Sequence, residues 1–499
     1  MKTDAPSSDS GRSSPGGECH TAFQPSRVRP VFVTSLVAAA MFMELLDGTI
    51  IATALPQMGR AFHASAVSLN IGMTAYMLTL AVFIPISGWM ADRMGSRSVF
   101  AAAITVFTLA SVLCGLSNGV TEFVLARILQ GIGGAMMVPV GRLIVLRATP
   151  KEDLAKAIAY ITWPALSAPI IGPPLGGFIT TYWSWRWIFF LNVPLGVTAL
   201  VLTALWISNE RTETRHAFDW RTFLLAGLGS TLFVYALELL SQTPVNFRLA
   251  LILLVISLVS GTLAVFTARK ADYPLIDLIS LRLPSFAQSI YGGSLFRIAV
   301  SVLPFLLPLM FQIGFGLNAF HSGLYVLVLF AGDLTMKSLV IPILRRFGFR
   351  RVLLVNGVFT AASVAICGAL TPGLSPWIII AVLFAHGALR SLQFTSISTL
   401  AYADIPPTHM SRANGFFSAV VQLSGSMGVA TGAALVRASG WFRKENLAQP
   451  SLQDFHFAML LVSVLVLFSL IDAVRLAPEA GAVASGHRAA LQDTIPVAE

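Results

Sequence analysis

The chain has 499 residues, of which 56% are hydrophobic and only 11% are charged. Ordinary soluble domains carry about 25% charged residues, so this composition excludes a soluble globular protein and indicates an integral membrane protein. The net charge of +10 does not indicate a nucleic-acid partner, because the basic residues are scattered through short connections and form no Lys- or Arg-rich tract.

The two ends of the chain are polar. Residues 1–29 are rich in Ser, Gly and Pro and predict a disordered tail, and residues 478–499 predict a second tail. The first apolar run is too long for the hydrophobic part of a cleavable signal peptide, so we expect it to remain as a membrane anchor. The three cysteines show no CxxC and no metal-ligand spacing, and we therefore expect no disulfide framework, metal or cofactor.

Apolar runs long enough to cross a bilayer follow one another along the chain, since a spanning helix needs about 20 mostly apolar residues. We predict about fourteen such helices. The runs cover 31–55, 68–90, 98–117, 121–146, 157–180, 186–208, 220–240, 248–268, 288–312, 321–344, 352–370, 376–401, 412–436 and 456–477.

Basic residues in the connections predict the orientation. Most of them fall on one side if both termini are cytoplasmic, as the positive-inside rule requires. The connection at 436–455 goes against this trend with three basic residues. We therefore expect a multi-pass protein of the plasma (inner) membrane with both termini in the cytoplasm.

An internal repeat divides the chain. "DRMGSR" at 92–97 and "RRFGFR" at 345–350 share the pattern x-R-x-G-x-R, and each follows a pair of predicted spans. The repeat predicts an N-terminal six-helix bundle at 30–210, an inserted helix pair with its linkers at 211–284, and a C-terminal six-helix bundle at 285–477. Parallel halves that hold a substrate between them are a known transporter architecture.

Five motifs occur in order: "LDGTIIATALP" (46–56), "GWMADRMGSR" (88–97), "RILQGIGGA" (127–135), "GPPLGG" (172–177) and "WRWIFFLNVPLG" (185–196). With these motifs the chain resembles the major facilitator superfamily, and within it the branch of 14-helix drug:proton antiporters, over residues 30–477. The resemblance implies an all-α membrane fold and proton-coupled export of amphipathic or cationic organic compounds by alternating access.

Two acids, Glu44 and Asp47, lie in the first apolar run and share one face of the predicted helix. Charged groups inside a membrane are costly and usually functional. The resemblance implies that Asp47, Glu44 and Arg127 couple proton movement to transport. The alternatives are a hydrogen-bonded carboxyl pair that shares one proton, caps on broken-helix carbonyls, and a structural clamp made by Arg127.

Two further motifs have roles that the resemblance implies. A cytoplasmic gate would consist of Gly88, Asp92, Arg93, Gly95 and Arg97. In that loop we expect a close helix approach at Gly88 and a tight turn at Gly95. We expect Asp92 to cap a neighbouring helix, such as the one that starts near Ser411, or to pair with an arginine. An antiporter kink would consist of Gly172, Pro173, Gly176 and Gly177. A short positive-inside loop and a merely close-packed helix are the respective structural alternatives.

The second half of the chain carries fewer signals. Asp333 and Lys337 are spaced i, i+4 and predict an ion pair on one helix. Arg390, Gln393 and His386 predict a polar stripe on one helix. We expect His386 to make a hydrogen-bonded helix contact, and a proton carrier is the alternative. The residues that we expect to line a substrate cavity are Tyr76, Gln130, Trp163, Gln312, Asp333, Lys337 and Arg390.

Arg142 and Arg297 are expected outside that cavity. Arg142 is expected near the cytoplasmic surface, with its charged end reaching water, and Arg297 is expected to be structural.

The predicted function is therefore proton-coupled multidrug efflux. The sequence contains no GxxxxGK[ST] loop, so nothing in it indicates ATP as the energy source. It also contains no HExxH or GxSxG motif that would indicate an enzyme. The alternatives are a proton-coupled transporter of a specific metabolite or organic acid, an uptake symporter, and a non-transporting sensor or scaffold. The expected partners are a small-molecule substrate, protons and membrane lipid; we expect a monomer and leave a periplasmic adaptor open.

Overall fold

A computed structural model describes residues 30–149, 154–207, 217–240, 246–271, 275, 278–406, 410–443, 450–478 and 480–481. For residues 30, 147, 154–160, 162–166, 410–412 and 440–443 it describes the backbone only. The predicted tail at 1–29, nearly all of that at 478–499 and the side chain of Trp163 lie outside the described residues.

Long apolar helices make up the described part of the chain. Thirteen of them are long and apolar enough to cross a membrane, and α6 (Leu154–Tyr182) adds a further helix of 29 residues. Bilayers admit such helices because every backbone N–H and C=O is satisfied within the segment. The prediction of an all-α membrane protein with about fourteen spans is therefore confirmed.

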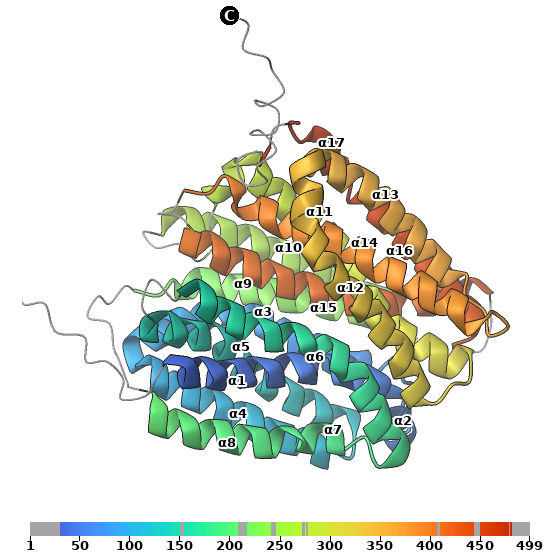
Figure 1. Cartoon of the computed structure of the whole chain (residues 1–499), viewed down its shortest axis with the longest axis horizontal. Coiled ribbons are helices and arrows are strands. Elements are labelled where there is room, and N and C mark those ends of the chain that lie inside the picture. Colours follow the sequence, from blue (N-terminus) through green and yellow to red (C-terminus); the bar gives the residue numbers. More distant parts are fainter. Residues whose placement is uncertain are drawn as a thin grey trace, which may run out of the picture.

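The N-terminal bundle packs six long helices together, in the lower part of Figure 1. They are α1 (Pro30–Ile50), α3 (Asn70–Met94), α4 (Ser96–Leu116), α5 (Val120–Ala148), α6 and α8 (Asn192–Trp206). Three short helices stand at their ends: η1 (Ile51–Thr53), α2 (Leu55–Ala61) and α7 (Trp187–Phe190).

The C-terminal bundle is built in the same way. Its long helices are α11 (Pro284–Leu309), α12 (Ala319–Phe347), α13 (Phe349–Gly368), α14 (Pro376–Ala403), α15 (Met410–Arg443) and α16 (Leu452–Phe468). Its short helices are η3 (Ser280–Arg282), η4 (Met310–Gly314) and α17 (Ile471–Arg475).

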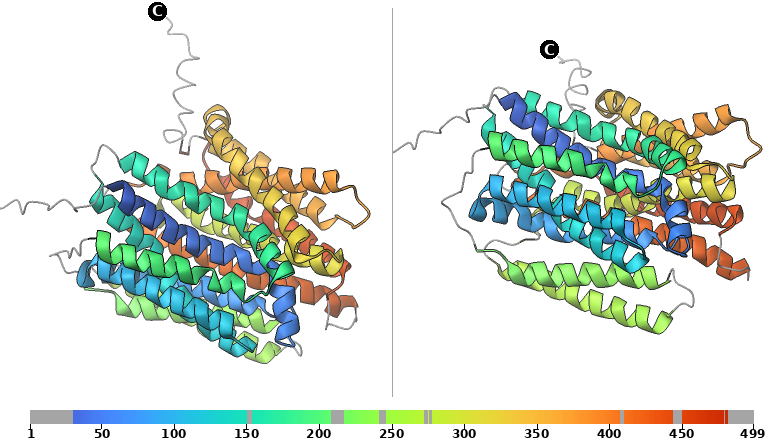
Figure 2. Two further views of the ribbon diagram at one scale, coloured as in Figure 1. Left: turned by 60° about the horizontal axis from the view of Figure 1, so that its bottom comes forward. Right: turned by 90° about the horizontal axis from the view of Figure 1, so that it is seen from below.

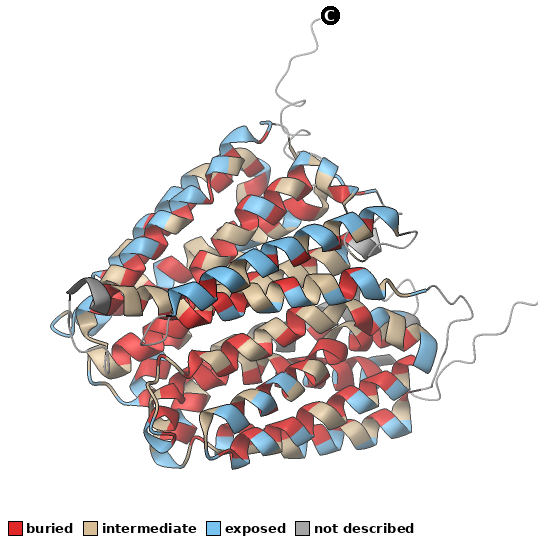
Figure 3. Cartoon of the chain, turned by 180° about the vertical axis from the view of Figure 1, so that it is seen from behind, coloured by how far each residue is buried: buried red, intermediate tan, exposed pale blue. Residues whose placement is uncertain are grey.

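The inserted pair is α9 (Trp220–Leu240) and α10 (Phe247–Lys270). Figure 2 shows the pair along one flank of the molecule, where α9 packs against α3 of one bundle and α15 of the other. The outward face of α10 exposes apolar side chains such as Leu251, Val255 and Leu258. Figure 3 shows exposed stripes of this kind along helices whose other faces are buried, as expected for helices that contact lipid.

The repeated loops fold in the same way in both halves. Gly95 and Gly348 have φ values of 94° and 72°, a region that favours glycine. The arginine two residues after each glycine reaches the end of its own bundle: Arg97 donates to the Ala204 carbonyl at 2.8 Å, and Arg350 to the Val474 carbonyl at 3.1 Å. The sequence repeat is therefore also a structural repeat.

The two halves meet closely at the end of the molecule opposite these loops. A β-carbon on Gly177 of α6 would lie 2.3 Å from the Ala319 carbonyl oxygen of α12. The Phe320 N–H donates to the Thr181 hydroxyl at 3.1 Å, and Gln312 donates to the Thr53 carbonyl at 3.2 Å. In Figure 1, α6 and α12 approach each other at this end and separate toward their other ends.

Candidate functional site

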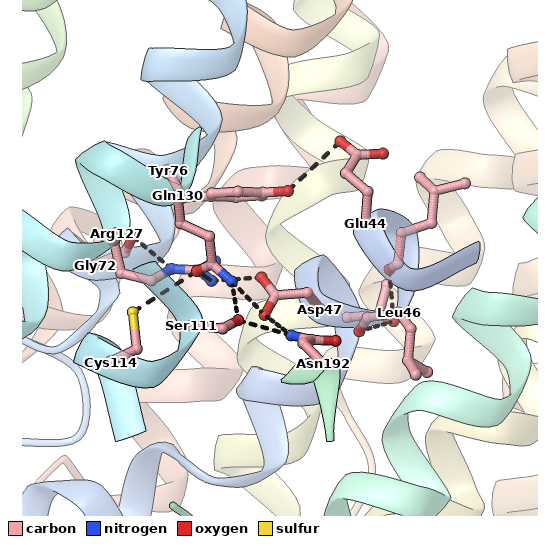
Figure 4. A network of polar contacts seen from close by, with 12 residues as sticks. Glu44, Leu46, Asp47, Gly72, Tyr76, Ser111, Cys114, Arg127, Gln130 and Asn192 are labelled. Carbon is pink, nitrogen blue, oxygen red and sulfur yellow. Dashed lines mark hydrogen bonds and ion pairs between the residues drawn. The ribbon is translucent and has the colours of Figure 1, made fainter. Parts of the chain in front are cut away.

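A closed polar network lies inside the N-terminal bundle, around Asp47 of α1 (Figure 4). One carboxylate oxygen, Oδ2, lies 2.5 Å from Nη1 of Arg127 on α5. The other oxygen accepts hydrogen bonds from Gln130 at 2.9 Å and from Asn192 at 3.0 Å. The Ser111 hydroxyl accepts from both amides, at 2.7 and 2.9 Å. Side chains of α5 and α8 therefore give both oxygens of this carboxylate a donor, and Ser111 of α4 links the two amides.

The guanidinium of Arg127 is fully buried. Besides its ion pair, it donates to Gln130 Oε1 at 2.7 Å and to the Gly72 carbonyl at 3.5 Å. Its carbon lies 4.1 Å from the centre of the Tyr76 ring, a cation–π contact that adds to the attraction. Removing a charge of this kind from its partner inside a membrane is costly, so the pair is a strong constraint on α1 and α5.

Glu44 lies one turn before Asp47 but in different surroundings. Its side chain is buried, and the hydroxyl of Tyr76 donates to its Oε1 at 3.5 Å. No salt bridge to Glu44 and no hydrogen bond between the two acids occurs within the described chain. The alternative of a hydrogen-bonded pair sharing one proton is therefore wrong, because each acid has its own partners.

Tyr76 links the two acids. Its hydroxyl contacts Glu44 and its ring covers the Arg127 guanidinium that pairs with Asp47. The backbone of α5 leaves room for this arrangement, because a β-carbon on Gly134 would lie 3.3 Å from the Tyr76 hydroxyl and 3.5 Å from Glu44 Cγ. A single side chain therefore contacts Glu44 directly and also contacts the arginine that pairs with Asp47.

The C-terminal bundle holds a more open ion pair. Arg390 of α14 lies 3.4 Å from Asp333 of α12, with side-chain exposures of 15% and 22%. The expected pair of Asp333 with Lys337 is wrong: the partner comes from the neighbouring helix, because α12 and α14 pack along their length. Both charges lie near the middle of their helices, where a charged group faces protein or a water-filled space rather than lipid.

The polar stripe on α14 is anchored to α13. Gln393 donates to the Leu353 carbonyl at 3.0 Å and accepts from Asn356 at 3.0 Å. His386 contacts the Ser363 hydroxyl through Nδ1 at 2.8 Å. The prediction of a hydrogen-bonded helix contact at this histidine is confirmed.

The loop expected to form a gate is only partly as predicted. Gly95 makes the tight turn, and Arg93 lies over the Trp89 ring at 5.4 Å. Gly88, however, is exposed and a β-carbon there would meet no atom within 4 Å, so it makes no close helix approach in this structure. Asp92 is half-buried. The side chain of Arg412, on the helix expected to meet this loop, is outside the described residues.

The glycines of the 172–177 motif are at helix contacts. A β-carbon on Gly172 would lie 2.3 Å from the Thr49 hydroxyl, and one on Gly176 would lie 2.5 Å from the Ile50 carbonyl, so α6 packs directly on α1. On the other side, the Pro173 carbonyl lies 2.3 Å from a β-carbon built on Gly323 of α12. This motif therefore holds α6 between the two halves.

Three residues expected to line a substrate cavity lie elsewhere. Tyr76 and Gln130 are 2% and 0% exposed because they belong to the closed Asp47 network. Gln312 is bonded across the contact between the halves. Two crevices among the described residues are mostly apolar, and both lie beside the inserted pair. They share Ala226 and Ser230 of α9 and Leu423 of α15.

Sequence reasoning missed two members of the network, Ser111 and Asn192. Asn192 lies within the motif "WRWIFFLNVPLG", which was a signal, although nothing in that motif shows that the amide reaches Asp47. It also missed a contact of the inserted pair, in which Asn70 of α3 donates to Glu238 of α9 at 3.1 Å.

No group of three or more potential metal ligands occurs among the residues with a described placement.

Comparisons with known proteins agree with this architecture. The family model described as Major Facilitator Superfamily matches residues 37–429, with a second match over 290–490. A protein named "Putative multidrug resistance protein MdtD" from Salmonella paratyphi A is 37% identical over 428 residues, covering 85% of this chain and 89% of the relative. Its namesake from Escherichia coli K12 is 37% identical over 418 residues, covering 83% and 88%.

Solved structures match the fold at low sequence identity. The xylose transporter XylE from E. coli, in a partially occluded inward-open conformation, superposes with a TM-score of 0.60 at 13% identity, over 91% of this chain and 100% of that chain. A bacterial homologue of the human lysosomal transporter Spinster, inward-facing and unoccupied, gives 0.61 at 16% identity, over 95% and 100%.

Proposed function

Because the chain belongs to the Major Facilitator Superfamily, we propose that it is a proton-coupled secondary transporter that exports amphipathic organic compounds. The name of its 37%-identical relatives supports multidrug efflux. The sequence offers no phosphate-binding loop that would indicate ATP as the energy source. In this proposal the chain acts as a monomer in the plasma membrane. The distribution of basic residues in the connections supports the cytoplasmic position of both termini.

The contrast between the two acids of α1 carries this proposal. Asp47 has a cation and two amide donors, so protonating it would break an ion pair and leave the buried charge of Arg127 uncompensated. Glu44 has one neutral donor at 3.5 Å, so it can gain or lose a proton without breaking a salt bridge. In this proposal Glu44 is therefore the group that gains and loses the proton. The ion pair of Asp47 with Arg127 stays formed and is affected by the change in the charge of Glu44.

Tyr76 would transmit the change. When Glu44 is charged it attracts the Tyr76 hydroxyl, and when it is neutral that attraction weakens. Since the same ring covers Arg127 at 4.1 Å, a shift of the ring alters the surroundings of the Asp47 ion pair. The helices joined by that pair, α1 and α5, would then move relative to α3.

Alternating access requires the two halves to rock. In this structure they are closed at the end formed by Gly177, Ala319 and Phe320. With the proposed orientation this end faces outward, so the conformation is inward-facing. The repeated loops at Gly95 and Gly348 would close the opposite end in the other state.

The energetics of one proton are sufficient for export. One charge moving through 100 mV releases about 2.3 kcal/mol, which supports roughly a 50-fold concentration ratio of an uncharged substrate; exchange of one proton for a monovalent cation moves no net charge and is driven by the pH difference alone. A test uses the purified chain in proteoliposomes with an imposed pH gradient and a pH-sensitive dye. We expect ethidium or a similar amphipathic compound to dissipate the gradient only in vesicles that contain the protein. Failure of every compound in a broad panel of amphipathic toxicants to do so would remove the antiport function.

A further inference from the structure

Two adjoining crevices lie where the inserted pair meets the bundles. The larger, of about 350 Å³, is lined by residues of α9, α10 and α15. The smaller, of about 170 Å³, is lined mainly by residues of α9, α3 and α15. They adjoin because they share Ala226, Ser230 and Leu423. An apolar cavity of about 150 Å³ already holds a benzene molecule, so the larger crevice has room for part of a hydrocarbon chain.

Small residues keep the larger crevice open. A β-carbon on Gly261 of α10, which lines it, would meet no atom within 4 Å. The hydroxyl groups among the lining residues of both crevices belong to Ser230 and Ser257, and Ser257 donates to the Gly229 carbonyl at 2.7 Å. The crevices therefore offer apolar packing and few hydrogen bonds, which suits a hydrocarbon chain better than a polar ligand.

Basic side chains stand at one end of the inserted pair. The hydroxyls of Thr222 on α9 and Thr267 on α10 lie 2.9 Å apart, so the start of α9 and the end of α10 lie at the same end. The exposed basic residues there are Arg221, Arg269 and Lys270. The exposed Trp220 packs on Trp89 of α3, with ring centres 5.7 Å apart. Tryptophans of this kind are enriched at the level of lipid headgroups.

The crevices lie close to this basic end. Phe223 lines the smaller crevice two residues after Arg221, and Ala264 lines the larger crevice five residues before Arg269. At 1.5 Å per residue, the basic residues therefore begin within roughly 8 Å of the crevices along the helix axes. An apolar space with positive charge at its end matches a lipid tail with an anionic headgroup.

The basic residues are not neutralised by the acid beside them. Asp219 accepts a hydrogen bond from the Thr222 N–H at 3.0 Å and so caps α9. Within the described chain, no salt bridge joins an acid to Arg221, Arg269 or Lys270. Their charges are therefore free to attract a phosphate group.

We propose that the crevices and this basic end form a binding site for one anionic phospholipid. An acyl chain would lie against Gly261 and Leu423, and the headgroup phosphate would contact Arg221, Arg269 and Lys270. Because α9 packs on α3 of one half and α15 of the other, the lipid would support the inserted pair over the line where the halves meet. With the proposed orientation, the headgroup lies in the cytoplasmic leaflet. The site goes beyond the transport function, and its occupancy can be measured without transport.

The test is native mass spectrometry of the purified full chain in detergent, titrated with dioleoyl-phosphatidylglycerol or dioleoyl-phosphatidylcholine. We expect the first phosphatidylglycerol to bind at least about 10-fold more tightly than phosphatidylcholine, since each basic residue near the surface attracts an anionic lipid roughly 5-fold. Equal affinities for the two lipids, or no bound lipid, would overturn the proposal.

Charge variants locate the headgroup. Arg269→Gln should weaken phosphatidylglycerol binding roughly 5-fold and leave phosphatidylcholine binding unchanged. Arg248→Gln is the matched control, because this exposed arginine lies at the opposite end of the same helix. It should change neither affinity. An Arg269→Gln/Lys270→Gln variant that keeps the full preference for phosphatidylglycerol would contradict the proposal.

A space-filling variant locates the acyl chain. Gly261→Leu places a side chain in the open crevice and should reduce phosphatidylglycerol binding, whereas Val255→Phe, on the exposed face of α10, should not. On the unaltered chain, dihexanoyl-phosphatidylglycerol should bind more weakly than the dioleoyl lipid, which tests the same point without a substitution. Equal binding of the two chain lengths would show that the crevice holds no acyl chain and would overturn the proposal.

A competition experiment separates a lipid from a transported compound. Ethidium should not displace the bound phosphatidylglycerol from the unaltered chain. Displacement by ethidium that Gly261→Leu abolishes would assign the crevice to an amphipathic compound and overturn the lipid assignment. Loss of pH-driven export with selective phosphatidylglycerol binding intact would remove the proposed function and leave the lipid site standing.

Discussion

Asp47 and Arg127 form an ion pair of 2.5 Å in which both side chains are removed from solvent. The pair joins α1 to α5, and Asn192 and Ser111 extend it to α8 and α4. It is therefore a structural centre of the N-terminal bundle as well as a candidate part of the transport mechanism.

Neutralising Asp47 should destabilise the protein. Asp47→Asn leaves the buried charge of Arg127 without its counter-ion, which typically costs about 3–5 kcal/mol. We expect a lower unfolding temperature and no pH-driven export, with protein still inserted in the membrane. The double variant Asp47→Asn/Arg127→Gln should recover part of the unfolding temperature without recovering export. Thermal unfolding of the detergent-solubilised variants measures this. If the double variant lost as much in unfolding temperature as the two single variants together, the result would contradict the pairing.

The Tyr76 hydroxyl should matter for coupling more than for stability. Tyr76→Phe removes the bond to Glu44 and keeps the ring over Arg127, so the stability should change by about 1 kcal/mol or less. Tyr76→Leu also removes the ring and should lower the unfolding temperature further. Efflux at different pH gradients measures coupling: we expect Tyr76→Phe to need a larger gradient for the same rate. A wild-type gradient dependence would argue against transmission through this hydroxyl.

The contact between α6 and α12 should not tolerate a larger residue. Gly177→Val places a β-carbon where only 2.3 Å separates it from the Ala319 carbonyl oxygen, so the halves cannot close fully at that end. We expect export to fall at least about 10-fold, because this contact must form once in each cycle. Labelling of a cysteine introduced at Thr181 should increase.

A matched control for this glycine is Gly373→Ala, where a β-carbon meets no atom within 4 Å. It should leave export and labelling unchanged. Unaltered export by Gly177→Val would show that this close approach is not needed in the cycle.

The ion pair of the C-terminal bundle gives a prediction that separates two partners. Asp333→Asn and Arg390→Gln should be coupled in a double-mutant cycle, by about 1 kcal/mol or less for a partly exposed pair. For Asp333→Asn and Lys337→Gln, the change in the free energy of unfolding of the double variant should equal the sum of the changes of the two single variants. Unfolding in urea or by heat supplies the energies, and coupling to Lys337 of similar size would contradict the structure.

Local sequence patterns predicted the features that depend on local geometry. The apolar runs predicted the spans because a helix must be about 20 residues long to cross a bilayer. The repeated x-R-x-G-x-R loops predicted the turn at Gly95, and the same backbone occurs at Gly348. Charges inside apolar runs singled out Asp47 and Arg127, since an isolated charge in a membrane is costly, and the structure shows the two as a buried ion pair. Their role in proton coupling stays a prediction.

Partners chosen by tertiary packing could not be predicted in this way. The i, i+4 spacing favoured Lys337 as the partner of Asp333, but α14 brings Arg390 closer. Glu44 and Asp47 share a helix face, yet α3 supplies the partner of one and α5 that of the other. Asn192 reaches Asp47 across 145 residues of chain, a distance over which one sequence carries no pairing signal.

The role of Glu44 can be measured by comparing exchange with pH-driven export for Glu44→Gln in proteoliposomes. The glutamine keeps the size and an acceptor for the Tyr76 hydroxyl but cannot carry a proton. We predict that substrate-for-substrate exchange continues at a rate near that of the unaltered protein, while an imposed pH gradient no longer drives accumulation. Full pH-driven export by Glu44→Gln would contradict the assignment of Glu44 as the group that carries the proton.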